Sequence, residues 1–399
     1  MTCPTKDVTV DRGLVTRAHP NLQRLRWFNL LLDLRLYGPF AIIYFAEVTG
    51  SYALGMSVFA TTQLTSALLE VPTGVLSDRA GRRMTMISGA FLSVLAICAY
   101  SVASGELLLF VGAVLEGTSR ALFSGNNAAL LHDSLAEDGM EANYHHHFGQ
   151  ISSMSQAGLA IGALLGGIIG YWSLIWVFWL SVIPQLAAWI ISLGMQEPRR
   201  ALGPRSYGFG HVWIAIRHIA HTPRLAWLTV AQSVSFGFGE ANFQFVTAFH
   251  RTLWPIWAIG ALRTAAHGLA ALSFWFAGPV IDRFSHLRVL IVGSTLGQLF
   301  HLLGLWLANL WSPAIMTIPS LLYGLNQTAK SHLLQQDFTD EQRATLGSVV
   351  SFAGSLVFVV AAIGAGMIAD TWGPTVALVT LLSIHLLVIP IYLGLFRNR

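Results

Sequence analysis

The stretch that decides the fold is Gly74-Val75-Leu76-Ser77-Asp78-Arg79-Ala80-Gly81-Arg82-Arg83. It holds two glycines, one acid and three arginines, and it lies between two apolar segments, 54–72 and 84–103. At a rise of ~1.5 Å per residue, each segment is long enough to cross the ~30 Å hydrocarbon core of a bilayer. Glycine lets a chain turn tightly, and arginine favours the cytoplasmic side of a membrane. The sequence therefore predicts a polar cytoplasmic loop at 74–83 between two membrane-spanning helices.

The composition of the whole chain is typical of a membrane protein. Of 399 residues, 54% are apolar and only 11% are charged, whereas soluble domains hold roughly 25% charged residues. The formal net charge of +4 comes from basic residues at span ends and not from a patch, which argues against a nucleic-acid partner. Two cysteines, Cys3 and Cys98, provide neither a disulfide framework nor a metal site.

Apolar segments predict an all-α membrane protein of twelve transmembrane helices in two six-helix bundles. A tail, 1–24, precedes the first bundle at 25–194, and a linker at 195–223 separates it from the second bundle at 224–399. Proline and glycine interrupt any continuous span in the linker. The predicted spans are 27–47, 54–72, 84–103, 107–131, 148–171, 173–194, 225–249, 256–279, 288–309, 313–333, 346–369 and 374–396.

The spacing of apolar residues and the distribution of charge predict a membrane-surface helix and the orientation of the chain in the membrane. Apolar residues recur at helical spacing between Phe209 and Ile219, which predicts an amphipathic linker helix on the membrane surface. If both termini are cytoplasmic, all but five of the 23 Lys and Arg residues fall in tails and inward-facing loops. This asymmetry indicates a multi-pass protein of the cell inner membrane with cytoplasmic termini. The exceptions are Arg251 in an outward loop and, within spans, Arg35, Arg120, Arg263 and Lys330.

The second half of the sequence repeats the first. The segment 278–288 keeps an Asp-Arg pair, and its Asp282 lies 204 residues after Asp78. The same offset relates Asp133 to Asp337 at the ends of two further spans. Such a repeat predicts two bundles related by an axis along the membrane normal.

The stretch 74–83 resembles motif A of the major facilitator superfamily, G-x-L-(A/S)-D-R-x-G-R-(R/K). The resemblance extends over about 25–396. It implies a secondary active transporter that works by alternating access and binds its substrate between the bundles near the bilayer midplane. The matching positions are Gly74, Leu76, Ser77, Asp78, Arg79, Gly81, Arg82 and Arg83.

The resemblance also implies a gate. In the outward-facing state we expect Asp78 to face the N-terminus of the eleventh span, and Asp133 to pair with Arg82 or Arg83. These contacts would form and break once in each transport cycle. The implied gating residues are Gly74, Asp78, Arg79, Gly81, Arg82, Arg83, Asp133, Asp282 and Arg283.

The fifth span resembles motif C, G-x-x-x-G-P-x-x-G-G, which in this family marks drug:proton antiporters. Gly158, Gly162, Gly166 and Gly167 match it, but Ala163 replaces the proline. The alternative interpretation is close helix packing through small residues, which is independent of the direction of transport.

Glu116 and Arg120 lie four residues apart in the fourth span and so share one helical face. Arg120 matches the family's motif B, R-x-x-Q-G, in part, since the glutamine is missing. Charged residues inside a membrane usually face a partner or a wet cavity. The pair is either a cavity pair for proton coupling or anion contact, or a structural ion pair of the bundle.

Three further spans carry candidate substrate or proton residues. Asp33 in the first span is either a site shared by proton and substrate or, with Arg35, part of a snorkelling interfacial pair. Glu240 in the seventh span lies among phenylalanines and is either a site for a cationic or aromatic ligand or a residue near the outer interface. Arg263 and His267 in the eighth span are candidate partners of Glu240.

Other patterns exclude competing functions. The run His145-His146-His147 has poor geometry for a metal, because neighbouring helical side chains diverge, and a solvated loop is the better interpretation. No phosphate-binding loop G-x-x-x-x-G-K-(S/T) is present, so we expect transport without ATP on this chain. We expect no cofactor and no metal.

The sequence thus predicts proton-coupled efflux, by antiport, of a small amphipathic compound. The alternative is a proton symporter or facilitator that imports a small nutrient or metabolite. A third possibility is a membrane enzyme or a non-transporting sensor on the same fold, but the sequence holds no set of residues at acid/base or metal spacing. The expected partners are the substrate, protons and the lipid bilayer, and the expected state is a monomer.

Overall fold

The computed structural model describes residues 19–199, 217, 219, 221–336 and 340–396. Helices account for its regular structure, and the described residues contain no β-strand. The predicted amphipathic helix of the linker, apart from residues 217 and 219, lies outside the described residues, as does Asp337.

The first half of the chain forms a bundle of long helices and short helical pieces. Its elements are α1 (Pro20–Asp33), η1 (Gly38–Phe40), α2 (Ala41–Thr49), α3 (Tyr52–Ala80), α4 (Arg82–Ser101), α5 (Glu106–Phe123), α6 (Asn126–Glu137), η2 (Glu141–Asn143), α7 (Tyr144–Gly170) and α8 (Leu174–Leu193).

The second half forms a similar bundle. Its elements are α10 (Pro223–Leu253), α11 (Ile256–Trp275), α12 (Ala277–Phe284), α13 (His286–Leu307), α14 (Ser312–Thr317), α15 (Ser320–Gln336), α16 (Asp340–Trp372), α17 (Pro374–Leu386) and α18 (Val388–Phe396).

These helices confirm the predicted class, an all-α membrane protein. Within the described part of the chain, eight helical segments are long and apolar enough to cross a membrane. A ninth is added if α11 and α12, which meet at 54°, form one bent span. The long helices α3 and α10 and the consecutive helices α14 and α15 complete a pattern of twelve segments.

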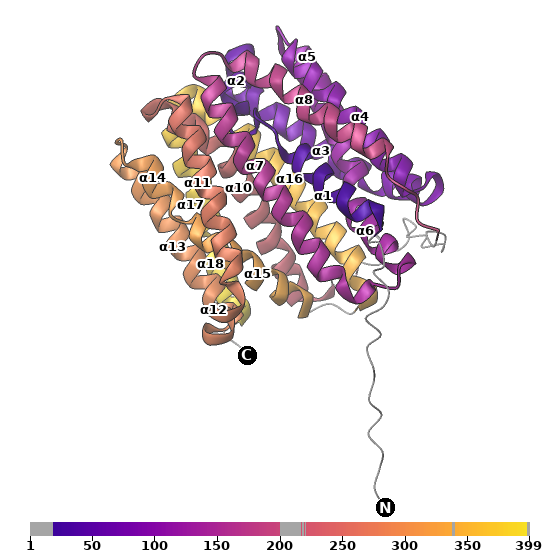
Figure 1. The fold of residues 1–399 in the computed structure, drawn as a ribbon. Coiled ribbons are helices and arrows are strands. Elements are labelled where there is room, and N and C mark those ends of the chain that lie inside the picture. The colour runs from indigo at the N-terminus through magenta and orange to yellow at the C-terminus, as the bar shows by residue number, and fades with distance from the viewer. Residues whose placement is uncertain (1–18, 200–216, 218, 220, 337–339, 397–399) are drawn as a thin grey trace, which may run out of the picture.

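The two halves lie side by side, and two helix pairs make the most extensive contacts between them. Figure 1 shows the first half in indigo to magenta and the second in orange to yellow. Helix α16 packs along α3, and α11 packs along α7. Glycines allow the closest approach: a Cβ atom on Gly366 of α16 would lie 2.5 Å from Ala53 Cα, and one on Gly260 of α11 would lie 2.6 Å from Gly167 Cα.

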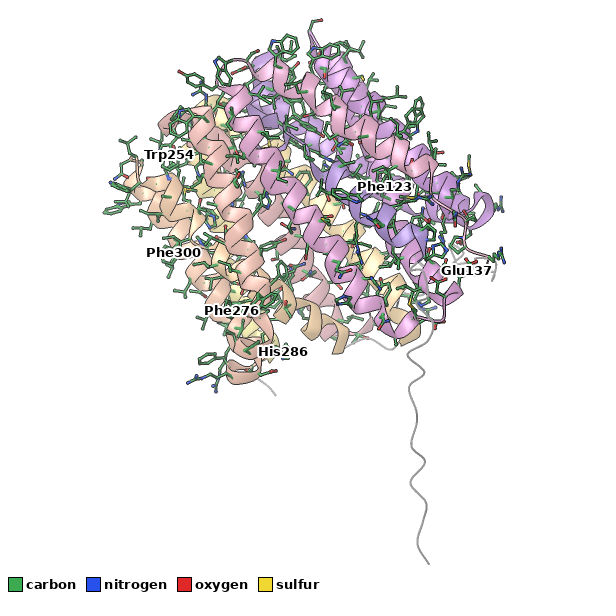
Figure 2. All side chains as sticks on the ribbon, in the orientation of Figure 1. Phe123, Glu137, Trp254, Phe276, His286 and Phe300 are labelled. Atoms are coloured by element: carbon green, nitrogen blue, oxygen red, sulfur yellow. The ribbon has the colours of Figure 1, made fainter. Side chains whose placement is uncertain are left out.

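The two ends of the molecule differ in how the halves meet. At the end formed by residues 50–53 and Asp370, here called the closed end, one hydrophobic core runs through both halves. It includes the fully buried side chains of Phe45 from α2 and of Phe245 and Phe358 from the second half. Towards the opposite end, at Gly81 and Glu137, the described core clusters each belong to one half. Figure 2 shows Trp254 towards the closed end and Glu137 and His286 at the opposite end.

The structure corrects two sequence predictions. The predicted loop at 74–83 is wrong for residues 74–80, because α3 continues to Ala80 and only Gly81, with φ of +92°, breaks the helix. A helix can extend beyond the bilayer with polar residues, so hydropathy marks the membrane boundary and not the helix end. The predicted first helix at 27–47 is also wrong as a continuous element, because it is interrupted between Asp33 and Gly38.

Candidate functional site

The interruption of the first span positions one arginine of the candidate site. Helix α1 ends at Asp33, and Pro39, which has no backbone N–H to donate, lies in the short helix η1 that precedes α2. The irregular backbone is fixed in part by the N–H of Arg35, which donates to Asp33 O at 2.8 Å. The Nε atom of Arg35 donates to Leu32 O at 3.1 Å. The end of its guanidinium is thereby free to reach across to α5.

The motif C glycines support this interruption from the side. A Cβ atom on Gly158 would collide with Leu30 O, and one on Gly166 would collide with Leu36 O. At Gly162 a Cβ atom would lie 3.1 Å from the N and O atoms of Arg35. Helix α7 therefore needs glycine at these three positions to pack against the backbone of the first span.

Glu116 is the centre of the polar contacts in the first half. Its Oε1 atom accepts from Arg35 Nη1 at 2.7 Å and from Arg120 Nη2 at 2.7 Å. Its Oε2 atom accepts from the hydroxyl of Tyr100 at 2.9 Å, and the hydroxyl of Tyr37 lies 3.4 Å from Oε1. We call these five residues the Glu116 cluster. One buried carboxylate is shared by two guanidinium groups, which satisfies the carboxylate and leaves an excess positive charge.

Asp33 supplies the second acid of this region. Its carboxylate lies near Ser155 of α7 and interacts electrostatically with Arg35 and Arg120. Two acids and two arginines thus balance in charge within the first half. The sequence offered Asp33 and Arg35 as a pair on one helix, whereas the helix ends between them.

In the second half, the candidate residues contact neutral groups. Glu240 accepts from Gln244 Nε2 at 2.7 Å. Arg263 donates to Thr247 Oγ1 at 2.7 Å, and its guanidinium carbon lies 4.7 Å from the ring centre of Phe243. Arg263 is close enough to Glu240 for an electrostatic interaction, although no ion pair within 4.0 Å joins them among the described contacts.

His267 takes part in the contact between the halves. Its Nδ1 atom lies 3.3 Å from Gln156 Oε1 of α7, and the hydroxyl of Thr264, three residues earlier, donates to Ala160 O at 3.0 Å. The described contacts therefore link His267 to the first half and do not make it a partner of Glu240.

The motif A region is organised by Arg82. Its guanidinium donates to Ser77 Oγ at 2.9 Å, lies 3.2 Å from Asp78 and lies 3.8 Å from Asp133. The side chain of Arg79 is exposed. All three of these described contacts of Arg82 lie within the first half.

Glu197 is a functional candidate that sequence reasoning missed. Its carboxylate accepts the backbone N–H groups of Arg82 at 2.8 Å and Arg83 at 2.7 Å, and so caps the first turn of α4. A Cβ atom on Gly81 would lie 2.9 Å from this carboxylate. The side chain of Arg83 donates to backbone carbonyls near the end of α8, including Met195 O at 2.7 Å.

The remaining motif positions make fewer contacts. A Cβ atom on Gly74 would meet no atom within 4 Å. Asp282 and Arg283 are exposed at the end of α12, and Arg283 lies over the ring of Phe284 at 5.6 Å. Among the described residues, no group of three His, Cys, Asp or Glu side chains could hold a metal ion. His146 and His147 lie in helix α7, so the predicted loop is wrong at these positions, and Nδ1 of His147 lies 3.2 Å from Nη2 of Arg26.

Two polar groupings were not predicted from the sequence. Asp370 of α16 accepts from Ser51 Oγ at 2.5 Å, Tyr52 N at 2.6 Å and Ala53 N at 3.1 Å, across the two halves. In the second half, Lys330 and His385 both contact Ser235. The sequence shows that Asp370 lies near a span end and that Lys330 lies inside a span. It does not show their partners, because these are set by tertiary packing.

Comparison with known proteins finds a matching family model, related sequences and solved structures of the same fold. A family model described as Major Facilitator Superfamily matches residues 28–329. The chain is 23% identical over 368 residues to a tetracycline resistance protein, class C, of Escherichia coli, covering 83% of this chain and 84% of that protein. It is 25% identical over 173 residues to the uncharacterized MFS-type transporter YhjO of Bacillus subtilis (strain 168), covering 42% of each. The crystal structure of the nucleoside transporter NupG has the same fold, with a TM-score of 0.79 at 10% identity over 95% of this chain and all of that one.

Proposed function

Because this chain belongs to the Major Facilitator Superfamily, we propose that it exports a small amphipathic compound in exchange for protons, by alternating access. As a member of this family the chain is a transporter. We propose that it performs no catalysis and needs no cofactor. A relative named for tetracycline resistance over most of both chains supports the direction of transport. The glycines of motif C support it further.

The observation that carries the proton-coupling proposal is the environment of Glu240. This acid lies inside α10 and hydrogen-bonds to the neutral amide of Gln244. An acid inside a membrane span is costly to keep charged and is commonly part of a proton or substrate pathway. Glu116, by contrast, is held by two guanidinium groups, so protonation there would break two ion pairs. Glu240 is therefore the first proposed proton carrier, and Asp33, the acid of the first span, is the second candidate.

The closed end supports a specific orientation. We propose that this end faces outward and that the structure represents an inward-facing state. The termini and the motif A residues then lie on the cytoplasmic side of the inner membrane, where the arginines of motif A are favoured. Opening outward would separate Asp370 from the start of α3 and bring Asp78 and its neighbours against the second half. The Arg82–Asp133 contact is already present in this state, so of the expected gate only the contact of Asp78 with the second half would form on opening outward. We propose that one copy of the chain suffices for this cycle.

The second candidate function is proton-driven or passive import of a small metabolite. Ala163 stands where motif C has proline, and the neighbouring glycines pack against the first span. Close packing of these glycines is compatible with both export and import.

Accumulation in cells separates these two functions. Cells that express the protein are loaded with fluorescent tetracycline and with a panel of aromatic acids, bases and neutral compounds, with and without a protonophore. An exporter lowers accumulation of its substrate, and the protonophore removes the difference. Asp33→Asn or Glu240→Gln should abolish export, whereas Glu106→Gln, at an exposed position, should not. Increased accumulation in energised cells would instead establish import.

A further inference from the structure

The second half holds a positive charge that the described side chains do not neutralise, and from it we propose that the substrate carries an anionic oxygen group bound by Lys330. This inference rests on the proposed function, since it assigns a substrate class to the same transport site. The anchor is the group formed by Lys330, Ser235, His385 and Gln298, here called the Lys330 cluster.

The Lys330 cluster joins four helices of the second half. Lys330 Nζ of α15 lies 3.4 Å from Ser235 Oγ of α10. The same hydroxyl lies 3.4 Å from His385 Nε2 of α17, and Gln298 Nε2 of α13 lies 2.9 Å from His385 Nδ1. Ser235 is the thirteenth residue of the 31-residue helix α10, so the cluster lies well inside the span.

The hydrogen-bond directions leave donors available to a ligand. The two ring nitrogens of His385 contact Gln298 Nε2 and Ser235 Oγ, and which of them donates depends on the tautomer. Ser235 Oγ accepts from Lys330 and fixes the position of its ammonium. Lys330 has two further N–H donors. An ammonium with two N–H donors still available is a suitable contact for a carboxylate, enolate or phenolate oxygen.

The charges of the described side chains also favour an anionic substrate. Among the described side chains, no carboxylate lies within 4.0 Å of Lys330, whereas Asp33 and Glu116 lie in the same region as two arginines. Glu240 is near Arg263. An uncompensated cation inside a membrane protein is costly and usually faces the interior or a wet cavity. An arriving anion would offset that cost, while a cationic substrate would add to it.

The first half holds an arginine whose guanidinium is only partly covered by its acid. The side chain of Arg120 is 37% exposed although its partner Glu116 is only 8% exposed. Its guanidinium therefore has surface that Glu116 does not cover.

Binding of matched probes tests this proposal on the purified full-length protein in detergent. The probes are carboxylate, amide and aminomethyl derivatives of benzene and naphthalene, including 1-naphthoate, 1-naphthamide and 1-naphthylmethylamine. Affinity is read from the shift in unfolding temperature with probe concentration. We expect the carboxylates to bind about tenfold tighter than the amides, as a charge-assisted hydrogen bond allows.

The variants assign this preference to the cluster. Lys330→Gln should remove the preference for carboxylates, Lys330→Arg should keep most of it, and Ser235→Ala should weaken it. Arg251→Gln removes an exposed charge outside the cluster and should leave it unchanged. If Lys330→Gln does not fold, Ser235→Ala decides.

The proposal is overturned if no carboxylate binds tighter than its amide, or if the amine binds tighter than the carboxylate. It is also overturned if both Lys330→Gln and Ser235→Ala keep the preference for carboxylates. Because these measurements involve no proton flux, they are independent of the proposed exchange with protons. A carboxylate preference without proton exchange would remove only the proposed function, and proton exchange without that preference would remove only this inference.

Discussion

The carboxylate of Asp370 accepts the backbone N–H of Tyr52 at 2.6 Å, and it thereby joins the last part of α16 to the first turn of α3. The contact is a helix cap made across the two halves of the molecule, since the first N–H groups of a helix have no partner within it. Ser51 and Ala53 donate to the same carboxylate. The closed end can open only if these three hydrogen bonds break.

Asp370→Ala should therefore favour opening of the closed end. Loss of a helix cap costs roughly 1 kcal/mol, so we expect the open population to rise about fivefold. The measurement is maleimide labelling of a single cysteine at Ala248, which is buried in the shared core, after Cys3 and Cys98 are replaced by serine. Thr371→Ala, next to Asp370 but bonded only within its own helix, is the control. Equal labelling of both variants would contradict the role of this cap.

Glu116→Gln should destabilise the first half. It leaves two guanidinium groups without their shared carboxylate, and breaking such a pair costs about 2 kcal/mol after allowance for the partial exposure of Arg120. The unfolding temperature in detergent should fall clearly below that of Glu106→Gln. Adding Arg120→Gln should restore part of the loss. If this double variant is stable and still transports, the Glu116 cluster is structural; a stable but inactive double variant indicates a functional cluster.

The glycines of α7 should tolerate alanine unequally, with large effects at the motif C positions and none at Gly149. Gly158→Ala and Gly166→Ala place a methyl group against carbonyl oxygens of the first span, and such overpacking costs about 1–3 kcal/mol. Gly149→Ala, in the same helix but with no atom near the added methyl group, should be neutral. Thermal unfolding of the three variants is the measurement. A similar effect of all three would mean that α7 does not pack as described.

Arg82→Ala should impair transport much more than Arg79→Ala. Arg82 contacts Ser77, Asp78 and Asp133, whereas the side chain of Arg79 is exposed. We expect a loss of most of the transport rate for Arg82→Ala and little change for Arg79→Ala, at equal amounts of folded protein. Equal rates would show that the contacts of Arg82 are not needed for the cycle.

Much of the fold could be predicted from the sequence because its signals are local or repeated. The polar stretch between apolar segments and the offset between Asp78 and Asp282 are visible without coordinates. The extent of α3 was not, since polar residues such as Asp78 and Arg79 can end a span without ending the helix. The break of the first span after Asp33 was not predicted either, since charged residues such as Asp33 and Arg35 also occur inside continuous helices.

The partners within the site could not be predicted in the same way. Glu116 and Arg120 are four residues apart and were found as a pair, but Arg35 and Glu116 are 81 residues apart. Their meeting depends on how α1, α5 and α7 pack. The contacts of Glu197 and Asp370 are longer in range still, and an exposed acid at a helix end gives no signal of which helix it caps.

The most direct measurement of the central claim is proton movement driven by the substrate in proteoliposomes. The vesicles contain the purified protein, a trapped pH-sensitive dye and the compound identified by accumulation, and they are diluted into buffer without that compound. Protein-free vesicles measure passive leak. If the compound leaves in exchange for protons, the vesicle interior becomes more acidic, and Asp33→Asn or Glu240→Gln abolishes this change. An interior that becomes alkaline, or keeps its pH while the compound leaves through the protein, would contradict proton-coupled export.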